Sequence, residues 1–346
     1  MSAPSRLKRE SSLGEEVAQR PEGPPSDAPS RPKRESSLGE EVAQRPEGPP
    51  SDAPSRPKRE SSLGEEVAQQ PEGPPSAAPS RLKRESSPGE EAAAPHAGLR
   101  VARDGKVTEL TLDRPRQRNS LSASLVAGLA QALADCASDG TRLVVLRGAP
   151  EAFCSGFDLG GLASETDDTL LARFVRVEQL LQQLVVAPFT TVAYAEGPAM
   201  GAGADLFAAC DYRYAADGTR FAFPGAGFGL VLGSRRLALQ VGGDTAQRWI
   251  TSGERLDVDE AASAGLVTAR LALDAWPDCL ARHRRQASRL DDDTHARIAR
   301  ATRLGAEPAA LDSDLAALVA SAARPGLKAR IEAYVQAGRQ TAGPRG

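Results

Sequence analysis

The feature that most constrains the fold is a strand, a glycine-rich turn and a helix in direct succession over residues 189–211. Residues 189–195 are rich in β-branched and aromatic side chains, which predicts a strand. Gly197, Gly201 and Gly203 follow, and the apolar run after them suits a buried helix. Such a turn leaves unpaired backbone N–H groups at the helix N-terminus, where they favour negative charge. Asp205 falls in the first helical turn; alternatively, it only complements the helix dipole of a structural turn.

Composition divides the chain near Ala94. Before that point there is no Phe, Trp, Tyr or Ile, and Lys8, Lys33, Lys58 and Lys83 mark a repeat of 25 residues. Each copy offers little more than one Leu and one Val for burial, too little to offset the entropy of ordering the chain. We therefore predict a disordered repeat tail over 1–95 rather than a solenoid, and we expect its deletion to leave activity intact.

Charge and cysteine content narrow the class of protein. Residues 1–95 hold 14 basic and 17 acidic residues and the remainder 29 of each, so neither nucleic acid nor an anionic membrane is expected as a partner. No apolar run reaches the ~18–20 residues of a transmembrane helix, and the N-terminus lacks the pattern of a secretory signal or a transit peptide. The four cysteines have no CxxC spacing, which favours free thiols and a cytoplasmic location.

The rest of the chain reads as an α/β domain. Alternation around Asp104-Gly105 predicts a β-hairpin over 99–112, and Ser122 is a plausible N-cap for the helix that follows. The order of the later elements predicts a parallel or mixed sheet flanked by helices. Those elements are a strand at 143–146, a strand edge at 152–159 broken by Gly156, a helix at 169–186, a strand at 220–223, and helices at 276–289, 293–304 and 311–340.

Three motifs in order carry a family resemblance. They are A-F-C-S-G-F-D-L at 152–159, E-G-P-A-M-G-A-G-A-D-L-F-A-A-C-D at 196–211, and T-S-G-E-R-L-D-V-D-E-A-A-S-A-G-L-V at 251–267. The series resembles the crotonase, or enoyl-CoA hydratase/isomerase, superfamily from about Leu99 to the C-terminus. The resemblance implies a crotonase-like α/β core of repeated ββα type over 96–270. It also implies a C-terminal helical region, 271–346, that covers CoA and builds a homotrimer or a dimer of trimers.

The resemblance also implies the catalytic groups. Two backbone N–H groups, of Phe157 and Ala202, would stabilise the negative charge that develops on a thioester oxygen as an enolate forms; removing one such donor typically costs about 3–4 kcal/mol of barrier. Asp205 takes the place of the first hydratase acid. Gly225 stands where the second acid would be, so two-acid addition of water is not supported.

CoA is expected as part of the substrate, with no separately bound cofactor and no metal. The residues that the resemblance suggests for contact with the CoA and acyl groups are Arg116, Arg118, Ser155, Gly156 and Gly201.

Other charged residues near the motifs have plainer interpretations. Glu165, Asp167 and Glu178 lie between the two loops, where some relatives place an acid, but solvated positions are expected for them. Arg235 and Arg236 open a helix, and a surface position is favoured over contact with a substrate carboxylate or the CoA phosphates.

Several tempting patterns are set aside. Gly225-Ala-Gly-Phe-Gly has the wrong spacing and context for a dinucleotide loop. His96, His283 and His295 form no metal-binding or triad-like set. Cys154 and Ser155 have no neighbouring base in the sequence, so packing is favoured over a nucleophilic role.

The sequence therefore predicts an enzyme that binds an acyl-CoA thioester and stabilises its enolate. Chemistry with one acid, of the isomerisation type, is preferred. The alternatives are a hydratase that works with a single acid, and a non-catalytic subunit that binds acyl-CoA or a partner protein.

Overall fold

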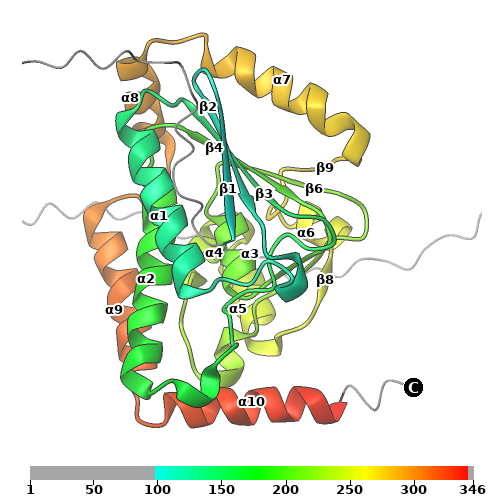
Figure 1. Cartoon of the computed structure of the whole chain (residues 1–346), viewed down its shortest axis with the longest axis vertical. Helices are drawn as coiled ribbons and strands as arrows, with labels where there is room; N and C mark the ends of the chain where they lie inside the picture. The colour runs from blue at the N-terminus through cyan, green and yellow to red at the C-terminus, as the bar shows by residue number, and fades with distance from the viewer. Residues whose placement is uncertain (1–97, 342–346) are drawn as a thin grey trace, which may run out of the picture. The chain divides into compact units, whose positions relative to one another are not determined.

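The computed structural model describes residues 98–341 (Figure 1). The predicted repeat tail lies outside the described residues. The described part is built on a six-stranded mixed sheet in the order β1-β2-β3-β4-β6-β9. Its strands are β1 (Leu99–Asp104), β2 (Val107–Leu112), β3 (Leu143–Gly148), β4 (Thr190–Ala195), β6 (Tyr212–Ala215) and β9 (Ala269–Arg270).

The first two strands form the predicted hairpin, and the others are parallel. β1 pairs antiparallel with β2 around the turn at Asp104-Gly105, which confirms the predicted hairpin. β2, β3, β4, β6 and β9 then pair parallel in turn. The predicted mixed sheet flanked by helices is therefore confirmed.

The two faces of the sheet follow from the alternation of side chains along each strand. In β3, Val144 and Leu146 belong to the large core cluster, which also holds the apolar faces of α1 (Ala123–Ser138) and α2 (Asp167–Val185). Leu143 and Val145 face the opposite way, into a smaller cluster with Trp276 at the start of α7 (Trp276–Ala287). In Figure 1, α1 and α2 accordingly flank the sheet on the opposite side from α7.

A second sheet of three short strands lies next to the first. It is formed by β5 (Pro198–Met200), β7 (Arg220–Ala222) and β8 (Leu256–Asp257), in the order β5-β7-β8. The glycine-rich turn predicted after residue 195 is wrong for residues 198–200, which pair parallel with β7. The run is only three residues long and contains Pro198, so it carries no strand pattern of its own.

The caps of the two long helices agree with their sequences. The Ser122 side chain accepts a hydrogen bond from the Leu125 amide at 3.2 Å, which confirms it as the N-cap of α1. The long helix begins two residues earlier than predicted, because Thr166 and Thr169 form a reciprocal cap at its start.

The single helix predicted at 311–340 is wrong. The structure has two helices there, α9 (Pro308–Ala322) and α10 (Leu327–Thr341). The break falls at Pro325-Gly326, where proline lacks the helical N–H and Gly326 adopts φ +79°. The remaining helices are α3 (Ala202–Ala208), α4 (Ser234–Val241), α5 (Gly243–Ser252), α6 (Val258–Ser263) and α8 (Asp292–Thr302), and the short 3₁₀ helices are η1 (Pro115–Gln117), η2 (Leu162–Ser164), η3 (Pro224–Phe228) and η4 (Leu273–Ala275).

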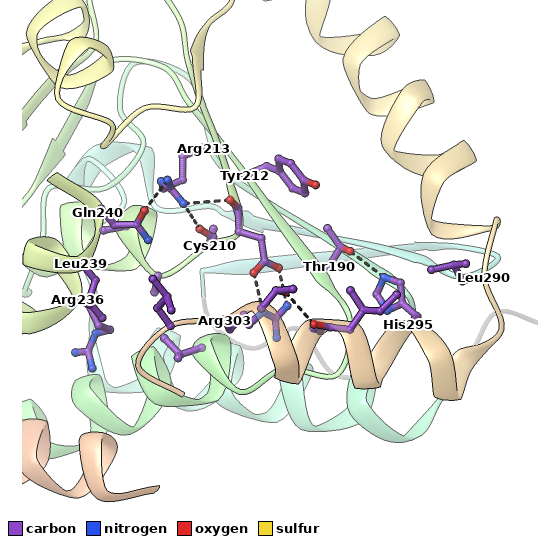
Figure 2. Close-up of a pocket in the computed structure, with 18 residues that line it drawn as sticks. Thr190, Cys210, Tyr212, Arg213, Arg236, Leu239, Gln240, Leu290, His295 and Arg303 are labelled. Atoms are coloured by element: carbon purple, nitrogen blue, oxygen red, sulfur yellow. Dashed lines mark hydrogen bonds and ion pairs between the residues drawn. The ribbon is translucent and has the colours of Figure 1, made fainter. Parts of the chain in front are cut away.

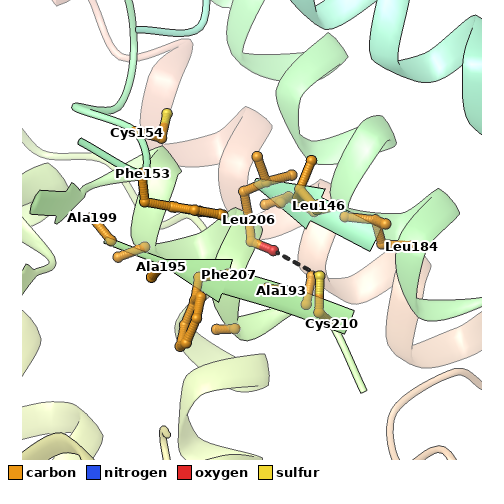
Figure 3. Close-up of a cluster of buried hydrophobic side chains, with 14 of the residues drawn as sticks. Leu146, Phe153, Cys154, Leu184, Ala193, Ala195, Ala199, Leu206, Phe207 and Cys210 are labelled. Carbon is orange, nitrogen blue, oxygen red and sulfur yellow. Dashed lines mark hydrogen bonds between the residues drawn. The ribbon is translucent and has the colours of Figure 1, made fainter. Parts of the chain in front are cut away.

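Helix α3 is buried along its whole length, and its Leu206 and Phe207 pack in the main hydrophobic cluster (Figure 3). Phe207 packs edge-on against Phe153, with the ring centroids 5.7 Å apart. A Cβ atom at Gly203 would lie 2.4 Å from the Cys154 carbonyl oxygen, so only glycine permits this approach. The segment 152–154 is thereby held directly against the N-terminal turn of α3. No helix of the described range is both long and apolar enough to span a membrane.

Candidate active site

The predicted oxyanion loops and Asp205 border one cavity of about 470 Å³. Its walls come from the segment Ser155–Leu159, β5, the start of α3, β7, η3, α5 and α10. Segments far apart in the sequence therefore meet at one hollow. The site residues predicted from sequence that line it are Arg118, Ser155, Gly156, Phe157, Gly201, Ala202, Asp205 and Gly225.

The two predicted oxyanion amides, of Phe157 and Ala202, belong to loops joined by backbone hydrogen bonds. The Cys154 amide donates to the Pro198 carbonyl at 3.1 Å, and the Met200 amide donates to the Cys154 carbonyl at 2.9 Å. Within the described residues, neither the Phe157 amide nor the Ala202 amide donates to another protein atom. Two donors on the wall of one cavity are thus available to a bound acceptor.

Glycines permit this close approach of the loops. Gly156 has φ +94°, and a Cβ there would lie 2.5 Å from the Met200 carbonyl oxygen and 3.5 Å from the Ala202 nitrogen. Gly201 has φ +51°, and its amide donates to the Ala222 carbonyl of β7 at 2.8 Å. Both positions have a positive φ, and Gly156 is also tightly packed, which explains why the sequence has glycine there.

Asp205 is the carboxyl group that faces the cavity. It is 6% exposed, and no side-chain hydrogen bond of its carboxyl group is present among residues 98–341. Burial raises the pKa of Asp205 to about 8; the positive charge of Arg236 opposes this shift and the negative charge of Glu178 adds to it. A carboxyl group with a pKa near the working pH can both donate and accept a proton.

Gly225 also lines the cavity and presents no functional side chain there. A Cβ atom at this position would have Leu230 as its nearest neighbour, at 3.9 Å. The position thus has room for a larger side chain, and glycine is not required by packing. Among the described residues that line the cavity, Asp205 is the one carboxylic acid.

A row of four aromatic rings forms one wall of the cavity. Phe157 stacks on Phe174 of α2 with the centroids 4.1 Å apart, and Phe174 lies 6.5 Å from Phe228 of η3. Phe228 in turn lies 5.2 Å from Tyr334 of α10. An apolar group bound beside the amides would find a largely preformed surface here. No local sequence pattern indicates this wall, because its members are spread over four distant segments.

Arginines line the cavity too. Arg118, Arg220 and Arg255 are exposed, and within the described part of the chain none of them makes an ion pair. Three unpaired cations beside one cavity suit an anionic ligand group. Of these, the sequence analysis named Arg118 but not Arg220 or Arg255. Arg116 is exposed and does not line the cavity, so its predicted contact with CoA stays a prediction.

Two further arginines fix the Phe157 loop from outside the cavity. Arg114 pairs with Asp158 at 2.7 Å. Arg173 donates to the Asp158 carbonyl oxygen at 2.8 Å, and its guanidinium carbon lies 4.2 Å from the centre of the Phe157 ring. Both contacts restrict the backbone immediately after the Phe157 amide.

The solvated position expected for three neighbouring acids is wrong for Glu178, while Glu165 and Asp167 keep partial exposure but have protein partners. Glu165 is half-buried and pairs with Arg173 at 2.5 Å, while Asp167 accepts the amides of Gly326 and Lys328 at the start of α10. Glu178 is fully buried and pairs with Arg236 through both carboxylate oxygens, at 2.8 and 2.5 Å. None of the three lines the cavity.

The surface position expected for Arg236 is also wrong. Arg236 is 5% exposed, and besides Glu178 it contacts Asp314 of α9 at 3.0 Å. Arg235 is half-buried and pairs with the same Asp314 at 2.8 Å. The sequence did hold a signal for Glu178, because it stands four residues after Phe174 and three before Leu181 on the apolar face of α2.

A second cavity, of about 460 Å³, lies between the end of α3, α4 and α8 (Figure 2). Its charged groups already have partners. Arg303 donates to both oxygens of Asp211, at 2.7 and 2.6 Å, and Arg213 donates to Gln240 at 2.8 Å. His295 lies 3.0 Å from the Thr190 hydroxyl. These groups hold the chain together and leave little for a ligand to bind.

Cys154 and the described histidines lie in settings that suit packing, whereas Ser155 lines the first cavity. Burial raises the pKa of the Cys154 thiol to about 12, which disfavours a thiolate. His283 is buried against Tyr214, with its Nε2 2.9 Å from the phenol oxygen. His96 lies outside the described residues. Within residues 98–341, no group of three or more His, Cys, Asp or Glu side chains is arranged to hold a metal ion.

Comparison with known proteins identifies the family. The model of the enoyl-CoA hydratase/isomerase family matches residues 102–316. A protein of Mycobacterium bovis named "Probable enoyl-CoA hydratase echA6" is 34% identical over 165 residues, which are 46% of this chain and 65% of the relative. The 2,3-dehydroadipyl-CoA hydratase of Escherichia coli is 32% identical over 177 residues, 49% of this chain and 67% of the relative.

Solved structures extend the match to nearly whole relatives. An enoyl-CoA hydratase/isomerase-type protein of Bordetella parapertussis is 40% identical with a TM-score of 0.67, over 69% of this chain and 98% of that one. An enoyl-CoA hydratase/isomerase of Mycobacterium paratuberculosis is 26% identical with a TM-score of 0.61, over 69% and 98%. The match to the family model covers more than half of the chain, and the fold is the one that these relatives share. The chain therefore belongs to the enoyl-CoA hydratase/isomerase family, within the crotonase superfamily.

Proposed function

We propose that the chain is an acyl-CoA enzyme that shifts the double bond of an enoyl-CoA thioester, with Asp205 as the acid/base group. The observation that carries the proposal is the asymmetry of the cavity: two free backbone amides and one carboxyl group line it, and Gly225 has no side chain to act as a second acid. One acid suffices for a reaction in which the same group removes a proton and returns it.

The proposed reaction needs no other reactant. Asp205 as a carboxylate removes a proton from C2 of a 3-enoyl thioester, and the C2–H electrons move into the conjugated system and onto the thioester oxygen. The Phe157 and Ala202 amides stabilise that oxygen as it gains charge. The protonated Asp205 then returns its proton to C4, the carbonyl re-forms, and the double bond lies between C2 and C3.

The surroundings of the site support a CoA thioester as the substrate. Arg118, Arg220 and Arg255 would attract the phosphates of CoA, because they have no ion-pair partner within the described residues. The aromatic wall that begins at Phe157 would receive an apolar acyl group.

Product analysis with two substrates tests the proposal. We expect the purified protein to convert a 3-enoyl-CoA to the 2-enoyl-CoA faster than it hydrates crotonyl-CoA. We also expect Asp205→Ala to remove the isomerisation. Faster hydration by the wild type would favour the single-acid hydratase. CoA binding without any turnover would favour the non-catalytic subunit, and equal isomerisation rates in both proteins would exclude Asp205.

The pH profile gives a second test. Since the pKa of Asp205 is about 8, only a minority of the free enzyme carries the carboxylate at pH 7. Proton abstraction from C2 requires that form, so kcat/KM for isomerisation should rise with pH and level off above pH 8. A rate that falls across the same range would mean that the protonated acid begins the reaction.

The assignment of a single acid can also be tested by introducing a second carboxyl group at Gly225. Because a side chain has room there, Gly225→Glu places a second carboxyl group on the cavity wall. We expect this variant to gain hydration of crotonyl-CoA relative to the wild type, with Gly225→Gln as the uncharged control. Equal hydration by the two variants would show that the missing acid does not limit that reaction.

We further propose a homotrimer or a dimer of trimers as the assembly. Leu239, Ile298 and Leu304, on α4, α8 and the segment after it, expose apolar side chains beside the second cavity and would suit a subunit contact. Light scattering should report a mass of three or six chains, and Leu304→Glu should lower it. A monomeric wild type would rule the assembly out.

A further inference from the structure

Asp205 lies beside a partly buried group of four charged side chains, here called the arginine–carboxylate cluster: Glu178, Arg235, Arg236 and Asp314. Glu178 binds Arg236 through both oxygens, Arg236 also binds Asp314, and Asp314 binds Arg235 through both of its oxygens. Two carboxylates and two guanidinium groups balance each other. The cluster joins α2, α4 and α9, and it carries no net charge.

Arg236 is the member that would otherwise ionise Asp205. A cation near a carboxyl group normally favours the carboxylate. The terminal guanidinium nitrogens of Arg236 are instead directed to Glu178 and Asp314. Among residues 98–341, no hydrogen bond joins Arg236 to Asp205. The backbone at Gly233 also lies close to Asp205, because a Cβ atom there would be 2.2 Å from the Asp205 Oδ1.

The charges that face Asp205 from the surrounding elements are few. Glu178 of α2 and Arg236 of α4 act on it electrostatically. The other segments near it, β5 and η3, contain no charged residue, and α3 contains none besides Asp205 itself. Besides burial, the balance of charge within the arginine–carboxylate cluster therefore acts on the ionisation of the acid.

We propose that Glu178 and Asp314 are positioning residues that keep Asp205 protonated in the resting protein at neutral pH: both neutralise the charge of Arg236, and Glu178 also acts through its own negative charge. The raised pKa of Asp205, caused first by burial, agrees with this arrangement. The ionisation of Asp205 is a property of the chain itself, and only its consequence for turnover rests on the proposed function.

Direct titration of Asp205 tests the proposal without any substrate. The infrared carboxyl band that is present in the wild type and absent from Asp205→Asn reports its protonation between pH 4 and 10. Glu178→Gln removes one negative charge and leaves Arg236 in excess. We expect its Asp205 midpoint to fall by at least about one pH unit. Asp314→Asn should shift the midpoint in the same direction by less, because Asp314 acts only through Arg236.

Glu109→Gln is the matched control, since Glu109 pairs with Arg147 at 3.2 Å and belongs to no part of the cluster. Its midpoint should equal that of the wild type. If Glu178→Gln fails to fold, Asp314→Asn decides the outcome, because it leaves the Glu178–Arg236 pair in place. An unchanged midpoint in the folded cluster variants would overturn the proposal.

The pH dependence of kcat/KM distinguishes a failure of this inference from a failure of the proposed function. If both hold, the rising limb of kcat/KM for isomerisation should move to lower pH in Glu178→Gln by the same amount as the titration. If Glu178→Gln shifts the titration of Asp205 but the wild-type protein turns over no acyl-CoA, the proposed function alone is contradicted. An active enzyme whose pH limb and titration are unmoved by Glu178→Gln would contradict this inference alone.

Discussion

Two cavities of nearly equal volume differ in how their polar groups are paired. In the cavity around Asp205, two backbone amides and one carboxyl group have no hydrogen-bond partner in the described residues, and three exposed arginines have no ion-pair partner there. In the cavity between α3, α4 and α8, the charged groups have protein partners, as Asp211 has in Arg303. Because buried polar groups are normally satisfied, unpaired ones identify a binding site better than volume does.

The sharpest test of this comparison replaces one polar group in each cavity. Asp205→Asn keeps the size of the side chain but removes the proton-transfer group, so kcat for isomerisation should fall about 10²- to 10⁴-fold. CoA binding, measured by calorimetry, should persist. His295→Gln in the second cavity is the control and should leave kcat within about 3-fold, since no catalytic step is assigned there. A comparable loss in both variants would remove the distinction between the cavities.

A glycine pair tests whether the close approach of the loops matters for turnover. Gly156→Ala places a Cβ against the Met200 carbonyl oxygen and should displace the Phe157 amide, which lowers kcat about 10²- to 10³-fold. Gly140 has a similar φ, +83°, with nothing within 4 Å of its Cβ position. Gly140→Ala therefore carries the backbone strain alone, and its kcat should stay near that of the wild type. Equal losses would attribute the effect to strain rather than to the site.

Stability should also depend on pH through Asp205. Its pKa is about 8 in the folded chain and near 3.9 when unfolded, so between these values folding retains a proton that the unfolded chain has released. The contribution of Asp205 to stability is complete below pH 4 and is lost as pH rises towards 8, by up to about 1.4 kcal/mol per pH unit. Urea unfolding of wild type and Asp205→Asn should show their difference changing with this sign. A pH-independent difference would contradict a buried, protonated Asp205.

Mutations in the second cavity should lower the free energy of unfolding and leave kcat unchanged. Asp211→Asn weakens the ion pair with Arg303 and the hydrogen bonds from Thr191. Because Arg303 would keep its charge in a partly buried place, we expect a loss of about 3 kcal/mol in unfolding free energy. The kcat of the folded protein should be unchanged. A stable variant with low kcat would assign a functional role to this cavity.

The smallest expected effect concerns the exposed arginines of the first cavity. Arg255→Gln should raise KM for an acyl-CoA about 3- to 10-fold without changing kcat, because an exposed cation contributes roughly 1 kcal/mol to anion binding. The difference should shrink as salt is added. A change that persists at high salt would point to a packing role. Arg248→Gln, which removes an exposed arginine that already pairs with Glu254, is the matched control.

The sequence predicted those parts of the molecule that depend on local patterns. The hairpin at 99–112 and the cap at Ser122 follow from turn and capping residues. The family resemblance was carried by short motifs, and the residues they suggest for the oxyanion amides and the acid line one cavity. Their assigned roles stay predictions until turnover is measured.

The rest could not be predicted because it depends on contacts between distant segments. Glu178 pairs with Arg236 across 58 positions of sequence, and no local pattern indicates which residue neutralises a buried acid. The aromatic wall needs Phe174 and Tyr334 from helices that are far apart in the chain. Strand β5 forms because β7 offers a partner, although its own three residues show no strand preference.

The most direct test of the account is a crystal structure with a non-isomerisable acyl-CoA bound in the cavity. We predict the thioester oxygen within about 3 Å of both the Phe157 and Ala202 nitrogens, with Asp205 facing the adjacent carbon. A thioester oxygen bound away from these two amides, or an α-carbon out of reach of Asp205, would contradict it.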